Sequence, residues 1–310
     1  MIIVSLVVIV FGGVIGGVIG ENVRPGAYGD MESGSQNDIT ADVITGMFIA
    51  TGVAVVMLLF GFYGGSGTIL AISGAKRIEK QDDPQLFNVV EEMAIAGGLP
   101  MPQIYLIDDS APNAFATGRD PEHSVVAITT GLRTKLTRDE LQGVIAHEMS
   151  HIRNYDIRFA MLMAVLVGLI ALMADFFLRY LWFGGGRRSR RSGNSSSDGG
   201  AAVLIMMLVA IVLSIIAPII AKLIQLAVSR QREYLADASA VELTRNPDGL
   251  AGALAKIAGD KEVLESANRA TQHLYIVNPI KSAEERAKFL FSTHPPIKER
   301  IARIMSLKHA

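Results

Sequence analysis

The sequence predicts a mainly α-helical membrane protein with a polar α+β domain that is divided between two stretches of the chain. Half of its 310 residues are hydrophobic and 19% are charged, against about 25% charged residues in a typical soluble domain. The mean hydropathy of +0.36 is also high for a soluble protein. The apolar residues are grouped in four runs, and the polar stretches beside them contain helix and strand patterns.

Composition excludes several classes of function. The net charge of −1, from 29 basic and 30 acidic residues, gives no reason to expect a nucleic-acid partner. The chain has no cysteine, which excludes disulfide bonds, thiolate metal ligands and a cysteine nucleophile. A bound metal ion must therefore be held by histidine, aspartate or glutamate.

Four runs of residues are apolar enough to cross a membrane, because a helix of roughly 18 or more apolar residues spans the hydrocarbon core. The four runs cover residues 2–20, 43–73, 159–183 and 201–221. The third run is the weakest, since Asp175 and Arg179 interrupt it, although their spacing lets them pair on one helix face. We expect four transmembrane helices.

These runs divide the chain into two hydrophobic hairpins and two polar segments. The predicted parts are 1–75 (spans at about 2–20 and 43–63), 76–158, 159–228 (with a flexible Arg/Gly/Ser loop at 184–200) and 229–310. Each polar segment has about 80 residues, which is marginal for independent folding. We therefore expect them to form one domain that the second hairpin interrupts.

The first apolar run is open to two interpretations, a cleaved signal peptide or an uncleaved anchor. No basic segment precedes it, as a signal peptide would require. Gly12, Gly16 and Gly20 follow the GxxxG spacing, which is typical of packed transmembrane helices. These features favour the anchor.

Flanking charges predict the orientation, because cytoplasmic loops are enriched in lysine and arginine. The loop 21–40 carries four acids and one arginine, which indicates the outer side. Basic residues follow the second run and precede the third, namely Lys76, Arg77, Lys80, Arg153 and Arg158. The polar segments are thus predicted to be cytosolic. The Arg-rich loop 184–200 disagrees, so either the second hairpin does not fully cross or the rule is overridden; four crossings are favoured.

The first polar segment contains one clear helix followed by strand patterns. Residues 84–95 have helical periodicity and end at the stop signal Gly97–Gly98. Strand patterns occupy residues 103–108, 113–118 and 123–130, which we expect to pair as a small sheet. Thr137 and Glu140 form a capping box that opens a second helix, predicted to continue to at least Asn154.

The second helix contains the pattern HExxH, formed by His147, Glu148 and His151. Histidines four residues apart lie on one helix face and can bind a single metal ion. Glu148 is then suited to take a proton from zinc-bound water, whose pKa is near 7. The alternative is a surface helix that carries two histidines by chance. The polar, capped context favours a zinc hydrolase.

A catalytic zinc site needs three protein ligands, so a third must lie elsewhere in the chain. A histidine six residues after His151 would serve, but that position is Ile157. Glu233 and Asp237 form an ExxxD pattern on one helix face. Glu233 is the predicted ligand, and Asp237 is predicted to orient a ligand or to pair with an arginine.

Four stretches of the sequence resemble those of a known protein family. The stretches HEMSHIRNYD (147–156) and SRQREYLADASA (229–240), together with NAFATG (113–118) and HPP (294–296), resemble the HtpX-type heat-shock membrane zinc proteases. That family is related to the endopeptidases that process prenylated CAAX proteins. The resemblance covers essentially the whole chain, although the Arg-rich loop is longer and more basic than expected.

The resemblance implies a gluzincin-type fold whose zinc site faces the cytosol. It implies zinc as the cofactor, one ion per chain, with ligands His147, His151 and Glu233 and with Glu148 as the catalytic base. It further implies proteolysis of membrane proteins in envelope quality control, at the cytoplasmic (inner) membrane. The expected partners are polypeptide substrates and the lipid bilayer.

Several weaker hypotheses concern residues around this site. Asn113, Ala114, Phe115 and Ala116 are interpreted either as an exposed strand edge that pairs with substrate or as a core strand. His294 is interpreted as an oxyanion donor or as a turn residue before a helix. Arg230 and Arg232 are predicted to pair with Asp237, to grip the substrate backbone or to contact lipid headgroups.

The spacing of the site residues from the apolar runs predicts a site close to the membrane. Glu233 lies about five residues beyond the apolar stretch that ends at Val228, roughly 8 Å along a helix. His151 precedes the third run by eight residues, about 12 Å. Two other functions compete with a protease. An intact Glu148 argues against a silent scaffold with a structural zinc, and the lack of repeated broken spans argues against a transporter.

Overall fold

The computed structural model describes residues 2–23, 36–183, 197–260, 262, 276 and 295–309. It divides into two compact units, each built from two stretches of the chain. The helical unit comprises Met1–Phe60 and Met163–Ile224, and the α/β unit comprises Gly61–Leu162 and Gln225–Ala310.

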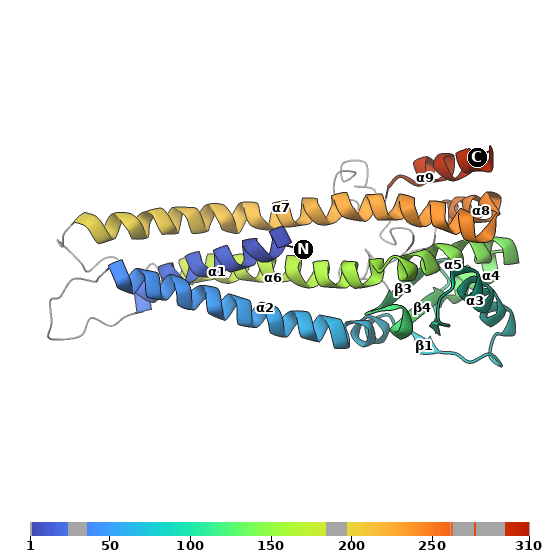
Figure 1. Cartoon of the computed structure of the whole chain (residues 1–310), viewed down its shortest axis with the longest axis horizontal. Coiled ribbons are helices and arrows are strands. Elements are labelled where there is room, and N and C mark those ends of the chain that lie inside the picture. The colour runs from blue at the N-terminus through green and yellow to red at the C-terminus, as the bar shows by residue number, and fades with distance from the viewer. Residues whose placement is uncertain are drawn as a thin grey trace. The chain divides into compact units, whose positions relative to one another are not determined.

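Four long helices correspond to the four apolar runs (Figure 1). They are α1 (Ile2–Val23), α2 (Gln36–Ile72), α6 (Asp156–Phe183) and α7 (Ser197–Thr244). In the described residues, three stretches are long and apolar enough to cross a membrane: Ala41–Ile72, Asp156–Arg179 and Met207–Thr244. A shorter apolar helix covers Ser5–Gly16. The chain is therefore a mainly helical protein with three candidate membrane helices, and the span at 2–20 stays a prediction.

The glycines of α1 pack closely against α2, as the GxxxG spacing predicts. A Cβ atom added at Gly16 would lie 2.6 Å from the Cα of Gly46, so only glycine permits this approach. Gly12 meets Ala50 in the same way, one helical turn along each helix. A small apolar cluster of Phe11, Ile15, Ala174, Phe177 and Ala210 forms the core of the helical unit.

The α/β unit contains a four-stranded sheet. Its strands are β1 (Lys76–Arg77), β2 (Gln103–Ile107), β3 (Ala114–Gly118) and β4 (Ser124–Thr129), in the order β1-β2-β4-β3. β2 and β4 are parallel, and the other two pairs are antiparallel. The three predicted strands are confirmed. β1 was not predicted, because two exposed residues carry no hydrophobic alternation.

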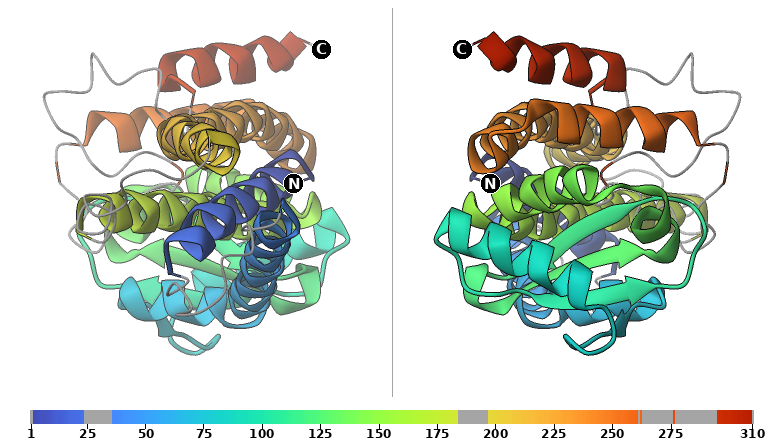
Figure 2. Two further views of the ribbon diagram at one scale, coloured as in Figure 1. Left: turned by 90° about the vertical axis from the view of Figure 1, so that its left-hand side faces the viewer. Right: turned by 90° about the vertical axis from the view of Figure 1, so that its right-hand side faces the viewer.

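Helices cover the sheet, and their ends follow the predicted signals. α3 (Pro84–Gly97) begins at the Asp83 cap and ends at Gly98, whose φ of +62° favours glycine. The unit also contains α4 (Thr130–Lys135), α5 (Arg138–Arg153), α8 (Pro247–Gly259), α9 (Ile297–Ser306) and the short 3₁₀ helices η1 (Pro121–His123) and η5 (Leu307–His309). Figure 2 shows the strands side by side, with α3 next to them in the right-hand view.

Helix α5 lies in the centre of the α/β core. It contacts α3, α8, β3 and β4. One face of the sheet joins α3, α5 and α8 in the main apolar cluster, and the other packs against the last turns of α2 through Leu70. The residues from Gly143 to Ser150 on α5 are all buried. The segment that carries His147 and Glu148 is therefore enclosed by the core of the unit.

The capping box that starts α5 gives a first testable prediction. The side chain of Thr137 accepts a hydrogen bond from the backbone N–H of Glu140, and the Glu140 carboxylate accepts one from the Thr137 N–H. We expect Thr137→Ala to cost about 1 kcal/mol of stability, which lowers the melting temperature in detergent by about 2–4 °C. Thr134→Ala is the control, because the exposed Thr134 hydroxyl only bonds to carbonyls of its own helix. Equal melting temperatures for the two variants would contradict a capping role.

Candidate metal centre

Three side chains predicted as metal ligands converge in the α/β unit. His147 and His151 lie one turn apart on α5, and Glu233 comes from α7. One ligand atom from each lies within 4.8 Å of the others. The two Nε2 atoms are 3.2 Å apart, and the Glu233 carboxylate oxygens lie 3.6 Å from His151 Nε2 and 3.7 Å from His147 Nε2.

A carboxylate contacts the far side of each imidazole. Asp237 Oδ1 lies 3.0 Å from His147 Nδ1, and Asp156 Oδ2 lies 2.9 Å from His151 Nδ1. A carboxylate partner keeps the proton on Nδ1 and leaves the Nε2 lone pair for a metal ion. Two unprotonated Nε2 atoms only 3.2 Å apart repel each other unless a cation lies close to both. The donor set therefore fits a metal ion held by two imidazoles and a carboxylate.

The charges around the histidines support the same conclusion. The ionisable groups that surround them are Glu148, Asp156, Glu233 and Asp237, with Arg232 and Arg300 as the bases. With every carboxyl group ionised, these four acids exceed the two bases by two charges. The four carboxylates are buried, where uncompensated charge is costly. One divalent cation would balance the cluster.

Glu148 is fully enclosed, with 1% of its surface exposed. Burial raises the pKa of the Glu148 carboxyl to about 7; the neighbouring Glu233 charge adds to the shift, whereas His151 and the Ala116 N–H oppose it. A divalent cation nearby would lower this pKa again. Burial also lowers the pKa of His147, which keeps the ring neutral as a metal ligand must be.

Comparison with known proteins identifies the family. The sequence profile of peptidase family M48 matches residues 80–308. The chain belongs to peptidase family M48.

Relatives within M48 define the type more closely. A protease HtpX homolog of Listeria monocytogenes serotype 4b (strain CLIP80459) is 47% identical over 266 residues, which cover 85% of this chain and 87% of the homolog. The protease HtpX homolog of Dictyoglomus turgidum is 45% identical over 259 residues, or 84% and 81% of the two chains. The chain is thus an HtpX-type M48 metalloprotease, and the His-His-Glu group fits the zinc dependence of M48 enzymes.

A solved structure has the same fold. The crystal structure of Ste24p from S. mikatae matches with a TM-score of 0.53 and 19% identity. The match covers 83% of this chain and 57% of the Ste24p chain. At this identity the likeness concerns the fold alone.

Two residues of this M48 centre were not predicted from the sequence. Asp156 lies beyond the end of α5, yet its side chain returns to His151 because Tyr155, with φ of +57°, turns the chain sharply into α6. Arg300, on α9, contacts Asp237 and Glu233. The spacing from Asp156 to the HExxH motif was available as a signal. For Arg300, the only signal in the sequence was the basic character of a helix near the C-terminus.

One of the three roles considered for the arginines, the pairing of Arg232 with Asp237, is not observed. Arg232 does not pair with Asp237; its guanidinium contacts Asp156. Asp237 is instead paired with Arg300. Arg230 lies near Tyr234 on the same helix.

The predicted substrate strand is both an edge strand and part of the core. Ala114, Phe115 and Ala116 lie in β3, at the end of the sheet, and all three are buried. Asn113 precedes the strand; its backbone N–H and carbonyl bond to Thr129, and its side chain accepts from the Ala114 N–H. Phe115 is fully buried beneath the sheet. His294 lies outside the residues that the structure describes.

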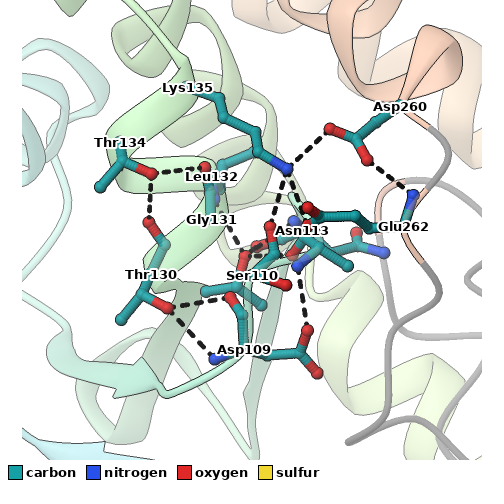
Figure 3. Close-up of polar contacts among 12 residues, drawn as sticks. Asp109, Ser110, Asn113, Thr130, Gly131, Leu132, Thr134, Lys135, Asp260 and Glu262 are labelled. Atoms are coloured by element: carbon teal, nitrogen blue, oxygen red, sulfur yellow. Dashed lines mark hydrogen bonds and ion pairs between the residues drawn. The ribbon is translucent and has the colours of Figure 1, made fainter.

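Polar contacts fix the loop that leads into β3 (Figure 3). Lys135 donates to the carbonyl of Ser110 and to the carboxylates of Asp260 and Glu262. Thr130 bonds to the backbone of Asp109 on the same loop. The start of β3 is therefore tied to α4 and to the end of α8, which restricts its movement beside the metal centre.

Proposed function

We propose that this chain is a membrane-embedded zinc endopeptidase in which His147, His151 and Glu233 hold one zinc ion per chain and Glu148 is the catalytic base. The convergence of three ligand atoms within 4.8 Å, beside the buried Glu148, carries the proposal. Two imidazoles and one carboxylate, with a further coordination position open, are typical of catalytic rather than structural zinc.

The roles of the protein groups follow from their contacts. Zinc, when bound, supplies a Lewis acid that polarises a carbonyl and lowers the pKa of a coordinated water to about 7. Glu148 accepts the proton of the attacking water and passes it to the amine nitrogen that leaves. Asp237 and Asp156 hold the two imidazoles in the orientation and tautomer that this requires.

We propose that substrate peptides lie along β3. Asn113 bonds to Thr129 on β4, so Ala114 and Ala116 present their backbone groups on the opposite side of the strand. The Ala116 N–H there interacts with Glu148, and the Ala114 carbonyl accepts from the Ile276 N–H. A peptide that replaced Ile276 as the partner of the Ala114 carbonyl would therefore lie beside Glu148, and main-chain pairing would impose little sequence preference.

The proposed location is the cytoplasmic (inner) membrane, with four crossings and the α/β unit in the cytosol as a gluzincin-type domain. The polar stretches 76–158 and 229–310 would form that domain, and the hairpins within 1–75 and 159–228 would anchor it. Three arginines stack on aromatic rings where the apolar helices enter the α/β unit: Arg119 on Tyr63, Arg158 on Phe62 and Arg232 on Phe159. Cytoplasmic loops beside membrane helices are enriched in arginine and lysine, and tyrosine is enriched at the membrane–water interface.

A zinc site at the cytoplasmic membrane surface suits particular substrates. They would be misfolded membrane proteins, cleaved in their cytosolic loops or tails during envelope quality control.

Hydrolysis by the purified protein tests whether the chain is a zinc-dependent protease. We expect it to hydrolyse casein, to lose that activity with a chelator and to regain it with zinc. Zinc binding without any hydrolysis would instead favour a silent scaffold.

Single-cysteine labelling tests the orientation, because the chain has no cysteine. In intact cells we expect Ser306→Cys to stay unlabelled by an impermeant maleimide and Ser35→Cys to be labelled. Ser306 is exposed, whereas a cysteine at Ser124 would be buried and would not react with the maleimide on either side of the membrane. Ser195→Cys reports on the second hairpin. Labelling of Ser306→Cys before lysis would overturn the cytosolic assignment, and its labelling after lysis is the control.

A further inference from the structure

Arg300 is a fully buried arginine beside the metal centre. It lies in the first turn of α9 and has no exposed surface. Its Nε and Nη2 atoms donate to the two carboxylate oxygens of Asp237, at 2.9 and 2.7 Å. Its Nη1 atom lies 3.0 Å from Glu233 Oε2 and donates to the carbonyl of Ile276 at 3.0 Å. A buried cation is stable only when it is paired and hydrogen-bonded. The partners of Arg300 come from two separate parts of the chain, helix α7 and Ile276.

We propose that Arg300 is a positioning residue that completes the metal centre from the C-terminal helix. This inference rests on the proposed zinc site. The two-pronged contact fixes Asp237, which in turn holds His147 through its Nδ1 atom. The contact with Oε2 of Glu233 leaves Oε1 for the metal ion. One guanidinium thereby orients two of the three ligands.

Arg300 does not reach the substrate. Its guanidinium is buried and its donors point to acceptors within the protein. It therefore acts through the ligands and not on the reacting atoms. Arg300 is linked to β3 only through the backbone of Ile276, which accepts from Arg300 and donates to the Ala114 carbonyl.

Two opposing effects determine how the loss of Arg300 changes the affinity for a metal ion. Its positive charge, with Nη2 3.4 Å from His147 Nε2, repels a metal ion and weakens binding. Its contacts hold Glu233 and His147 in place and strengthen binding. Removal of a residue that orients metal ligands typically costs 10- to 100-fold in metal affinity. We expect the second effect to win, because without Arg300 the carboxylates of Glu233 and Asp237 repel each other and turn away.

The test measures the zinc dissociation constant of the full chain in detergent by competition with a chromogenic chelator. We expect Arg300→Ala and Arg300→Lys each to bind zinc about 10- to 100-fold more weakly than wild type. Lysine keeps the charge but lacks the planar fork that engages both oxygens of Asp237. The control is Arg303→Ala on the same helix, where the exposed Arg303 stacks on Tyr234 and pairs with Glu299. We expect it to bind zinc as wild type does.

Two further measurements separate positioning from a general loss of structure. Millimolar methylguanidinium should restore zinc binding to Arg300→Ala, because it can fill the vacated site, whereas methylammonium should not. The effects of Arg300→Ala and Asp237→Asn on zinc affinity should be strongly non-additive, since both act on His147. If Arg300→Ala does not fold, Arg300→Lys decides.

Wild-type affinity in Arg300→Lys, or in a folded Arg300→Ala, would overturn the positioning role. If the wild-type chain itself binds no zinc, the proposed metal site fails instead, so the two failures are distinguishable.

Discussion

Glu148→Gln is expected to abolish peptide hydrolysis and to leave zinc bound. Glutamine has the same shape as glutamate, but its amide cannot accept a proton from water at neutral pH. A positioned general base contributes about 100-fold or more to the rate. The metal affinity should change little, because His147, His151 and Glu233 keep their contacts with Asp237, Asp156 and Arg300.

The measurement pairs casein hydrolysis with the zinc content of the same preparation. Asp139→Asn is a matched control, since it also replaces an acid on α5 but at an exposed position in the first turn. It should keep full activity. A Glu148→Gln variant with more than about 1% of wild-type activity would contradict the assignment of Glu148 as the general base. Loss of zinc from that variant would show instead that Glu148 contributes to the metal site.

Glu233→Ala is expected to lose zinc and hydrolysis together. Two imidazoles alone hold zinc weakly, because a catalytic site uses three protein ligands. The substitution also leaves Arg300 with one carboxylate fewer, so the unbalanced positive charge beside His147 further disfavours a cation. Both effects act in the same direction, which makes this the largest expected loss of metal affinity among the variants considered.

Zinc content after dialysis checks this prediction, with Glu242→Ala as the control on the same helix. Glu242 is exposed two turns further along α7 and has no part in the centre. Stoichiometric zinc in dialysed Glu233→Ala would mean that a different residue is the third ligand. Asp237 would then be the first to substitute, since it already lies 3.0 Å from His147.

The sequence alone predicted those features that depend on neighbours along the chain. The capping box of Thr137 and Glu140 and the end of α3 at Gly98 are decided within a few residues, so their signals are local. The four-residue spacing of His147 and His151 predicted one helix face for the same reason. The apolar runs predicted long helices because length and composition suffice for that inference.

Only the tertiary structure decided which charges meet. Pairing with Asp237, which lies close in sequence, was one of the three roles considered for Arg232, but its guanidinium contacts Asp156 on another helix. Asp237 is bound by Arg300, 63 residues away, and the same guanidinium approaches His147, 153 residues away. No periodicity encodes such pairs, because they arise from the packing of α9 and α8 beside α5 and α7.

The edge position of β3 has the same origin. The pattern at 113–118 indicates a strand, but strand order depends on the β2–β4 pairing, which inserts a later strand between two earlier ones. The sequence thus determined which side chains were available for chemistry and on which local elements they lie. The tertiary structure determined which of them form one buried charge cluster. A buried charge is costly unless it is paired, and its partner can come from any part of the chain that packs beside it.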